Sequence, residues 1–300
     1  MATARRHVIF GTVGALLLGA AVVAWLALRP DASAGPCVVV NGPATIREVN
    51  EASGLAISRR NPGVIWTHND SGNDAVLFAI DGNGTLHGRT RVPIRTRDWE
   101  DVSFGPCPSG HCLYIADIGD NRNARQRVQI YRVPEPAVGD AETAAPEVFN
   151  ATYADGPHNA EAMFVIGTAL FIVTRDRTGG LYRAVIPETD SHDLRFELLG
   201  QLGIVPVTDA ETSTDGKSVV VRTSHEAVLY RTVDLSRGII APILRVPLDG
   251  LKEMQGEGVA LDGNMLYLAS EARAWILAAK ILTLRCTIVT SISSPVATAR

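Results

Sequence analysis

A short motif centred on one glutamate recurs along the chain, and this repeat constrains the fold more than any other feature. Its pattern is a small or acidic residue, the glutamate, a small residue and an apolar residue, with some variation between copies. The marked positions are Ser53, which replaces the glutamate in a first copy, Glu100, Glu161, Glu211 and Glu257. The steps between them are 47, 61, 50 and 46 residues. Recurrence at this interval indicates one supersecondary unit repeated along the chain.

Strand-like segments follow each motif in the same order. Apolar runs rich in β-branched and aromatic residues alternate with short turns that contain Gly, Asp or Asn. The second strand of each repeat is expected at 64–66, 113–116, 170–173, 219–221 and 265–268, and the third at 75–80, 128–133, 181–186, 228–233 and 275–281. A weaker fourth strand precedes the next motif. Four antiparallel strands repeated every ~40–50 residues predict an all-β fold, a β-propeller, whose blades stack because one repeat cannot bury both of its faces.

The number of marked positions predicts five blades, with six as the alternative if one blade has diverged. The last copy lacks a clear fourth strand. Residues 37–49 could supply it and close the ring, and residues 287–294 could do so instead. We therefore predict one propeller domain over residues 36–300.

The N-terminal segment has the length of a membrane span. Residues 8–28 contain no charge, and 21 residues are enough for a helix to cross ~30 Å of hydrocarbon. Arg5 and Arg6 would keep the preceding end in the cytoplasm. Residues 32–34, Ala-Ser-Ala, also fit a signal-peptidase site, so a secretory signal is the alternative. We expect residues 1–35 to be an anchor or signal with a short linker, and the propeller to lie outside the cytoplasm, on the cell membrane or secreted.

Export favours disulfide formation by the four cysteines of the chain. Cys107 and Cys112 bracket four residues and predict a stapled hairpin loop. Cys37 and Cys286 lie at the two ends of the predicted propeller, so their bridge would lock one end to the other. Free buried thiols are the alternative.

Propeller topology predicts one polar face. The innermost strand of each blade begins beside the marked glutamate, and the second strand returns to the same face. The candidates from the first-strand starts are Glu100, Asp101, Glu161, Glu211 and Glu257. The candidates from the second-strand exits are Asn69, Asp70, Asp117, Asp120, Asn121, Arg175, Arg222, His225 and Glu271. We predict that these residues form a ligand-binding face.

Carboxylates gathered around one axis repel each other and need neutralising partners. Ca²⁺ or another divalent cation could bind them, because hard cations take oxygen ligands; the predicted ligands are Glu100, Glu161, Glu211 and Glu257. Arg175 and Arg222 could pair with them instead. Backbone N–H groups of a neighbouring blade are the third possibility, and a purely structural one.

Charge and motif content exclude several functions. The chain has 28 Lys plus Arg against 32 Asp plus Glu, a net charge of −4, which argues against a nucleic-acid partner. The sequence contains neither Gly-x-Ser-x-Gly nor His-Glu-x-x-His. We therefore assign no catalytic residue.

Residues 98–102 and 113–121 resemble a group of exported actinobacterial propeller proteins without an established activity, and residues 159–162 and 214–223 fit the same group. More distantly, the pattern is similar to the six-bladed TolB-like superfamily that includes gluconolactonases, paraoxonases and propeller phytases. That similarity implies a divalent ion held by carboxylates at the channel mouth, with the glutamates of the repeat as the counterparts by position.

Two functions follow from this interpretation. The first is a membrane-anchored or secreted propeller that binds a small ligand or a protein partner on its acidic face. The alternative is a divalent-metal-dependent hydrolase of lactones, esters or phosphate esters. The serine at position 53 and the lack of an evident general base favour the first, whereas the density of carboxylates favours the second. Whether the protein is an enzyme stays open at this point.

Overall fold

Contacts within the chain define one compact unit that begins at Ser33. The computed structural model describes residues 33–108, 110–187, 191–272 and 278–288 of it. None of the helices among these residues has the length and apolar character needed to cross a membrane. The predicted span at residues 8–28 lies outside the described residues.

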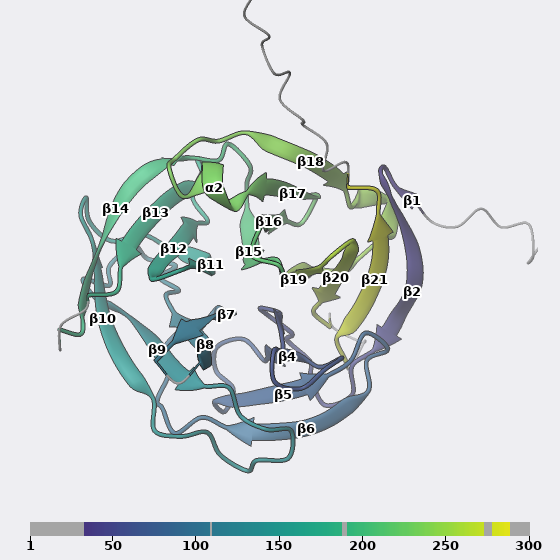
Figure 1. Ribbon diagram of the computed structural model, residues 1–300, viewed down its shortest axis with the longest axis horizontal. Coiled ribbons are helices and arrows are strands. Elements are labelled where there is room, and N and C mark those ends of the chain that lie inside the picture. The colour runs from purple at the N-terminus through teal and green to yellow at the C-terminus, as the bar shows by residue number, and fades with distance from the viewer. Residues whose placement is uncertain (1–32, 109, 188–190, 273–277, 289–300) are drawn as a thin grey trace, which may run out of the picture. The chain divides into compact units, whose positions relative to one another are not determined.

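Antiparallel strands dominate this unit and follow one another in groups of four (Figure 1). The first group is β3 (Ala56–Ile57), β4 (Ile65–His68), β5 (Val76–Ile80) and β6 (Leu86–Arg91). The second is β7 (Asp101–Cys107), β8 (Gly110–Asp117), β9 (Val128–Pro134) and β10 (Glu147–Tyr153), and the third is β11 (Ala160–Ile166), β12 (Ala169–Thr174), β13 (Gly180–Val185) and β14 (Asp193–Gln201). The fourth is β15 (Val207–Thr212), β16 (Ser218–Thr223), β17 (Glu226–Arg231) and β18 (Pro242–Pro247).

The last group is completed by the opposite end of the chain. It contains β19 (Gly256–Asp262), β20 (Met265–Ser270), β21 (Lys280–Cys286) and, as its fourth strand, β2 (Cys37–Thr45). β1 (Ser33–Ala34) adds a short outer edge to β2. Pairing of β2 with β21 confirms the first of the two predicted closures, and Cys37 faces Cys286 in the register.

Both predicted disulfides are present. Cys37 and Cys286 join the closing pair of strands across 249 residues, and Cys107 and Cys112 staple the β7–β8 hairpin. Two short helices, α2 (Thr232–Leu235) and η1 (Asp249–Leu251), flank β18 in the sequence.

Hydrophobic clusters lie between consecutive groups. One cluster packs the second group on the third, for example Tyr114 on Met163, and others pack the third on the fourth and the fourth on the last. A further cluster packs the first group on the second, and another packs the last group back on the first, with Ile281 and Ile65 among its members. Each sheet therefore buries both faces against its neighbours around one central axis, which defines a β-propeller.

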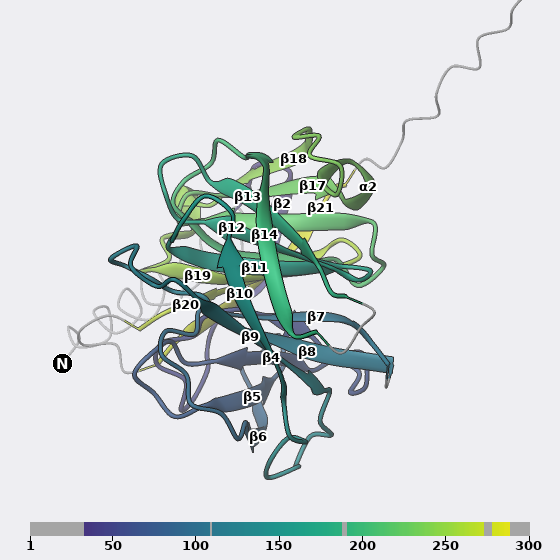
Figure 2. The ribbon, with the colours of Figure 1, turned by 90° about the vertical axis from the view of Figure 1, so that its left-hand side faces the viewer.

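The outer strands of the second and third groups also pair. β10 runs parallel to β14, with Asn150 opposite Asp193 and Tyr153 opposite Phe196, so the two groups form one eight-stranded sheet (Figure 2). The repeat pattern does not predict this pairing, because each outer strand is expected at a free edge.

The strand register corrects one copy of the sequence motif. The inner strand has a bulge in the third and fourth groups, and the bulged residues are Glu161 and Thr208. The Thr208 hydroxyl donates to the Glu257 carbonyl oxygen at 3.0 Å, and the Ser53 hydroxyl donates to the Glu100 carbonyl oxygen at 2.5 Å. Thr208 is therefore the equivalent of Ser53 and of the glutamates. The prediction that Glu211 occupies this position is wrong by three residues. It followed the residue type, whereas the equivalent position is the one at the β-bulge.

Candidate functional site

Carboxylates gather where the inner strands begin, and we name this part of the molecule the acidic end. Glu100, Glu161 and Glu257 stand at equivalent positions of three groups, and each is about 5% exposed. Asp70 and Glu271 come from the turns that leave β4 and β20, and both interact electrostatically with Glu161. The structure thus brings together three of the four predicted metal ligands and two residues of the predicted ligand-binding face.

Burial and mutual repulsion hold several of these groups in their neutral forms. Burial, reinforced by the charges of Glu161 and Asp70, raises the pKa of Glu100 to about 11. Burial likewise raises the pKa of Glu271 to about 8 and that of Glu257 to about 7. The Glu100 carboxyl receives no hydrogen bond from any residue within the described ranges. Desolvated carboxylates without donors favour the arrival of a positive charge.

Arg175 supplies a cation at the acidic end. Its Nη1 lies 2.6 Å from Oε1 of Glu161, and its side chain remains 37% exposed. The charge of Arg175 also lowers the pKa of Glu100 and of Glu257, but less than burial raises them. Pairing with an arginine, one of the three predicted ways to neutralise the carboxylates, therefore applies to Glu161. Its neighbours have no ion pair in the described part of the chain.

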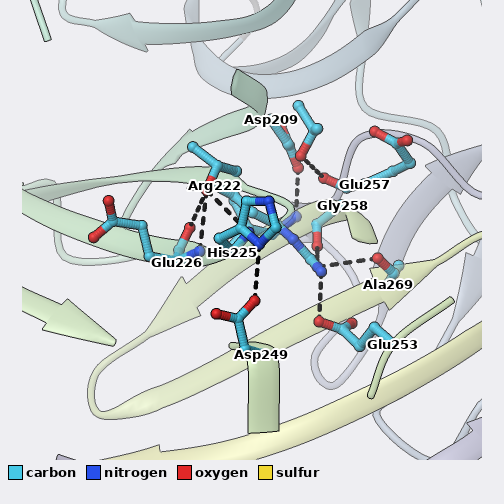
Figure 3. A network of polar contacts seen from close by, with 12 residues as sticks. Asp209, Arg222, His225, Glu226, Asp249, Glu253, Glu257, Gly258 and Ala269 are labelled. Atoms are coloured by element: carbon cyan, nitrogen blue, oxygen red, sulfur yellow. Dashed lines mark hydrogen bonds and ion pairs between the residues drawn. The ribbon is translucent and has the colours of Figure 1, made fainter. Parts of the chain in front are cut away.

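Arg222 has a different role from the one its position suggested (Figure 3). This β16 residue is fully buried and ion-pairs with Glu253 at 2.6 Å. Its Nη1 donates to the carbonyl oxygens of Gly258 at 2.7 Å and Ala269 at 3.0 Å. A Cβ at position 256 would overlap the Arg222 guanidinium, which explains the glycine there. Arg222 thus fastens the fourth group to the last and does not face a ligand.

A pocket lies beside this fastening. It has a volume of about 260 Å³ and is formed by the β16–β17 turn and the segment that leads into β19. His225 and Asp249 line it, and the hydrogen bond of 2.8 Å between Nδ1 of His225 and Oδ1 of Asp249 is largely exposed (Figure 3). Gln255, at its inner side, donates to Oε1 of Glu257 at 2.8 Å. The pocket therefore connects through one hydrogen bond to the acidic end.

One step further along the inner strands, two aspartates meet near the axis. Asp101 and Asp209 are both fully buried and interact electrostatically, and Oδ1 of each accepts no hydrogen bond within the described residues. The Oδ2 atom of Asp101 accepts the Met163 N–H at 2.6 Å, and that of Asp209 accepts the Val259 N–H at 2.5 Å and the Leu55 N–H at 3.3 Å. This pair therefore links the inner segments of all the groups.

The surroundings of the aspartate pair favour its retaining a proton. Burial is the largest cause that raises the pKa of Asp101 well above its usual range and that of Asp209 to about 7. Two carboxylates in contact in a dry interior cannot both be ionised. The sequence pattern did not single out Asp209. The repeat was aligned on Glu211, so Asp209 was only a residue close to the marked position.

Glu211 lies apart from the other predicted metal ligands. It is buried two residues beyond Asp209, where it accepts the Ser103 hydroxyl at 2.5 Å and the Phe104 N–H at 3.2 Å. Among the described residues, no group of three or more His, Cys, Asp or Glu is arranged to hold a metal ion. The four predicted glutamates do not fit one coordination shell in this arrangement, because Glu211 is engaged elsewhere and Arg175 holds Glu161.

The remaining predicted residues organise turns. Asp117 accepts the N–H groups of Arg97 and Asp98 and pairs with Arg125 at 2.8 Å. Asp120 accepts the Arg125 N–H at 2.6 Å. The Asp120 contact is a local hydrogen bond of the kind that aspartate makes in turns, whereas Asp117 joins the end of β8 to the segment that precedes β7.

Two asparagines make similar contacts. Asn69 accepts the N–H groups of Asn50 and Glu51, each at 3.0 Å, and Asn121 accepts an Asn159 side-chain N–H at 3.4 Å. These side chains fix the loops around the acidic end.

The strand order, the clusters between sheets and the acidic end define the class: a β-propeller with carboxylates at one end of its axis. No family model matches the chain, and no curated protein matches it. One solved structure similar to it is titled "Crystal structure of RRP9 WD40 repeats". It is 9% identical, with a TM-score of 0.43 over 86% of this chain and 99% of that chain. Because this TM-score is low, the propeller fold is assigned from the strand pairing of this chain alone. The resemblance to exported actinobacterial propellers and to gluconolactonase-like enzymes stays a prediction.

Proposed function

We propose that this protein is a five-bladed extracytoplasmic propeller that binds a positively charged group of a small ligand or partner protein at its acidic end. The observation behind this proposal is the excess of buried carboxylates over cations. Glu100, Glu257 and Glu271 have raised pKa values and make no ion pair within the described part of the chain, where Arg175 pairs with Glu161 instead. A bound cation would let these carboxylates ionise.

The blade number and the location have separate support. Each group of four strands, including the one completed by β2, has the composition of one blade. The two disulfides suit an oxidising compartment. The uncharged run at residues 8–28 supports a membrane anchor, with the cleaved signal as the alternative.

Thermal melting of the full-length protein tests the proposal. The probes are agmatine, which carries a guanidinium and an ammonium group, and Ca²⁺, each against NaCl of equal ionic strength. A ligand at 100 times its Kd adds about 2.7 kcal/mol, or about 5 °C in Tm for a domain of this size. We expect a rise with agmatine that shrinks in Glu257→Gln. Glu197→Gln is the matched control, because Glu197 is an exposed β14 residue. A Tm that no cation raises contradicts the proposal.

Metal-dependent hydrolysis of lactones, esters or phosphate esters is the second candidate. Its supporting observation is the convergence of Glu100, Glu161 and Glu257 at one end of the axis. The Arg175 ion pair with Glu161 opposes it, since this cation holds an oxygen that a metal would need. A Tm rise with Ca²⁺ that EDTA reverses, and that agmatine does not reproduce, would favour this function over the first.

A further inference from the structure

The inner strands end in a second pocket, on the side of the aspartate pair away from the acidic end. The pocket has a volume of about 210 Å³. It is formed by the β7–β8, β11–β12 and β15–β16 hairpins, with Arg59 contributed by the segment after β3. The buried Asp101–Asp209 pair lies between it and the acidic end along the same strands. The two ends of the axis are therefore separate sites.

The charge of this pocket is opposite to that of the acidic end. Arg59 and His111 line it, and none of its lining residues is an aspartate or glutamate. The Arg59 guanidinium lies 4.6 Å from the centre of the Phe104 ring, and the His111 ring lies 5.3 Å from that centre. Stacking on an aromatic face orders a guanidinium without removing its charge.

Two contacts position Arg59. Its backbone N–H donates to Oε2 of Glu135 at 3.1 Å, and its Nη1 donates to the Ile57 carbonyl oxygen at 3.0 Å. Arg59 makes no ion pair with a carboxylate within the described residues. A fixed guanidinium whose charge is not matched by a carboxylate is the usual receptor for an anionic group.

Glu211 lies on β15, next to the pocket residue Thr212, and its carboxyl group is already engaged by hydrogen bonds. Glu211 is held at the inner side by Ser103 and the Phe104 N–H. Burial raises the pKa of Glu211 well above its usual range, and the Ser103 hydrogen bond and the Arg59 charge oppose that rise. Phe104, Val165 and Ile166 form the apolar part of the lining, and Thr212, Ser213 and Thr214 add hydroxyl groups.

We propose that this pocket is a second binding site, which takes a small carboxylate with an apolar body. The carboxylate would pair with the Arg59 guanidinium, and the apolar body would lie among Phe104, Val165 and Ile166. The pocket is smaller than the ~300–1,000 Å³ of ligand sites in general, so a compound of about benzoate size fits it.

Isothermal titration of the full-length protein with benzoate, benzamide and benzylamine tests this site. The three probes share one ring and differ in charge. We expect benzoate to bind at least tenfold more tightly than the neutral benzamide, and benzylamine to bind no better than benzamide at this site. A benzoate affinity equal to that of benzamide in the wild-type protein overturns the proposal, and this comparison needs no variant.

Variants locate the binding. Arg59→Gln should weaken benzoate at least tenfold, whereas Arg60→Gln, which removes the adjacent and more exposed arginine, should leave it unchanged. Glu257→Gln, at the other end of the axis, should also leave benzoate binding unchanged. Equal benzoate affinity in wild type and Arg59→Gln would contradict the assignment. If Arg59→Gln melts early, Arg59→Lys, which keeps the charge and loses the planar fork, should give an intermediate affinity.

Discussion

At the scale of single residues, Asp101 and Asp209 show how one proton stabilises the centre of the propeller. Each carboxylate accepts backbone N–H groups of other blades through Oδ2, whereas its buried Oδ1 has no hydrogen-bond partner among the described residues. The protonated form of Asp101 is mimicked by asparagine, whose N–H₂ can donate to Asp209 while its oxygen accepts from Met163. The amide has no proton to lose at high pH.

The pH dependence of stability tests this shared proton. A carboxyl group whose pKa is higher in the folded state contributes stability at low pH and loses it as pH rises. The loss is roughly 1.4 kcal/mol per pH unit for each proton released on unfolding. We expect the wild-type free energy of unfolding to fall between pH 5 and pH 8. Asp101→Asn should reduce the slope of this fall by about the amount that one released proton contributes. Urea unfolding at several pH values measures it, and equal slopes for both proteins would exclude the shared proton.

Arg222 makes a second prediction at this scale. Arg222→Leu leaves the buried Glu253 carboxylate unpaired and removes the donors to two carbonyl oxygens. We expect a loss of roughly 3–5 kcal/mol in the free energy of unfolding. Arg245→Leu removes an ion pair of 2.8 Å whose arginine is half-exposed, and should cost about 0–1 kcal/mol. Denaturant unfolding of both variants compares them, and equal losses would contradict the fastening role.

The sequence predicts part of this site for identifiable reasons. Glu100, Glu161 and Glu257 share a motif and a topological position, so a repeat argument finds them. Thr208 occupies the same position but is not a glutamate, so the repeat pattern predicted Glu211 there instead. The aspartate pair depends on contacts across the axis between residues 108 positions apart in the sequence. A pattern within one repeat does not contain such contacts.

At the scale of strands, the closing pair of β2 and β21 completes the propeller. The sequence allowed two closures, and the N-terminal strand is the one used. Cysteine positions supported it, because Cys37 and Cys286 are directly opposite in the register. The parallel pairing of β10 with β14 was not predictable in the same way, since it depends on how two outer edges approach in space.

The two disulfides should differ in their effect on stability. Loop entropy assigns about 5 kcal/mol as an upper figure to the bridge across 249 residues and about 2 kcal/mol to the bridge across five. Replacing Cys37 and Cys286 by serine should therefore lower the Tm more than the same change at Cys107 and Cys112. Calorimetry of the two double variants measures the difference. A larger loss for the hairpin bridge would contradict the closing role of β2.

At the scale of the whole molecule, charge divides the propeller along its axis. Carboxylates with raised pKa values occupy one end, a buried aspartate pair lies in the middle, and a pocket lined by Arg59 lies at the other end. The net charge of the chain is only −4, so this polarity comes from where the charges lie and not from a large excess of one sign. We therefore expect cations and anions to bind at opposite ends.

Proton release on cation binding tests the central claim most directly. A cation at the acidic end lowers the pKa of Glu257 and Glu271, which are partly protonated near pH 7. Titration of the full-length protein with agmatine, in buffers of different ionisation enthalpy, should show net proton release and a Kd that decreases from pH 6 to pH 8. Glu257→Gln should release fewer protons. Agmatine binding with no proton release and the same Kd at both pH values, or no binding at all, would contradict the assignment of the acidic end as the ligand site.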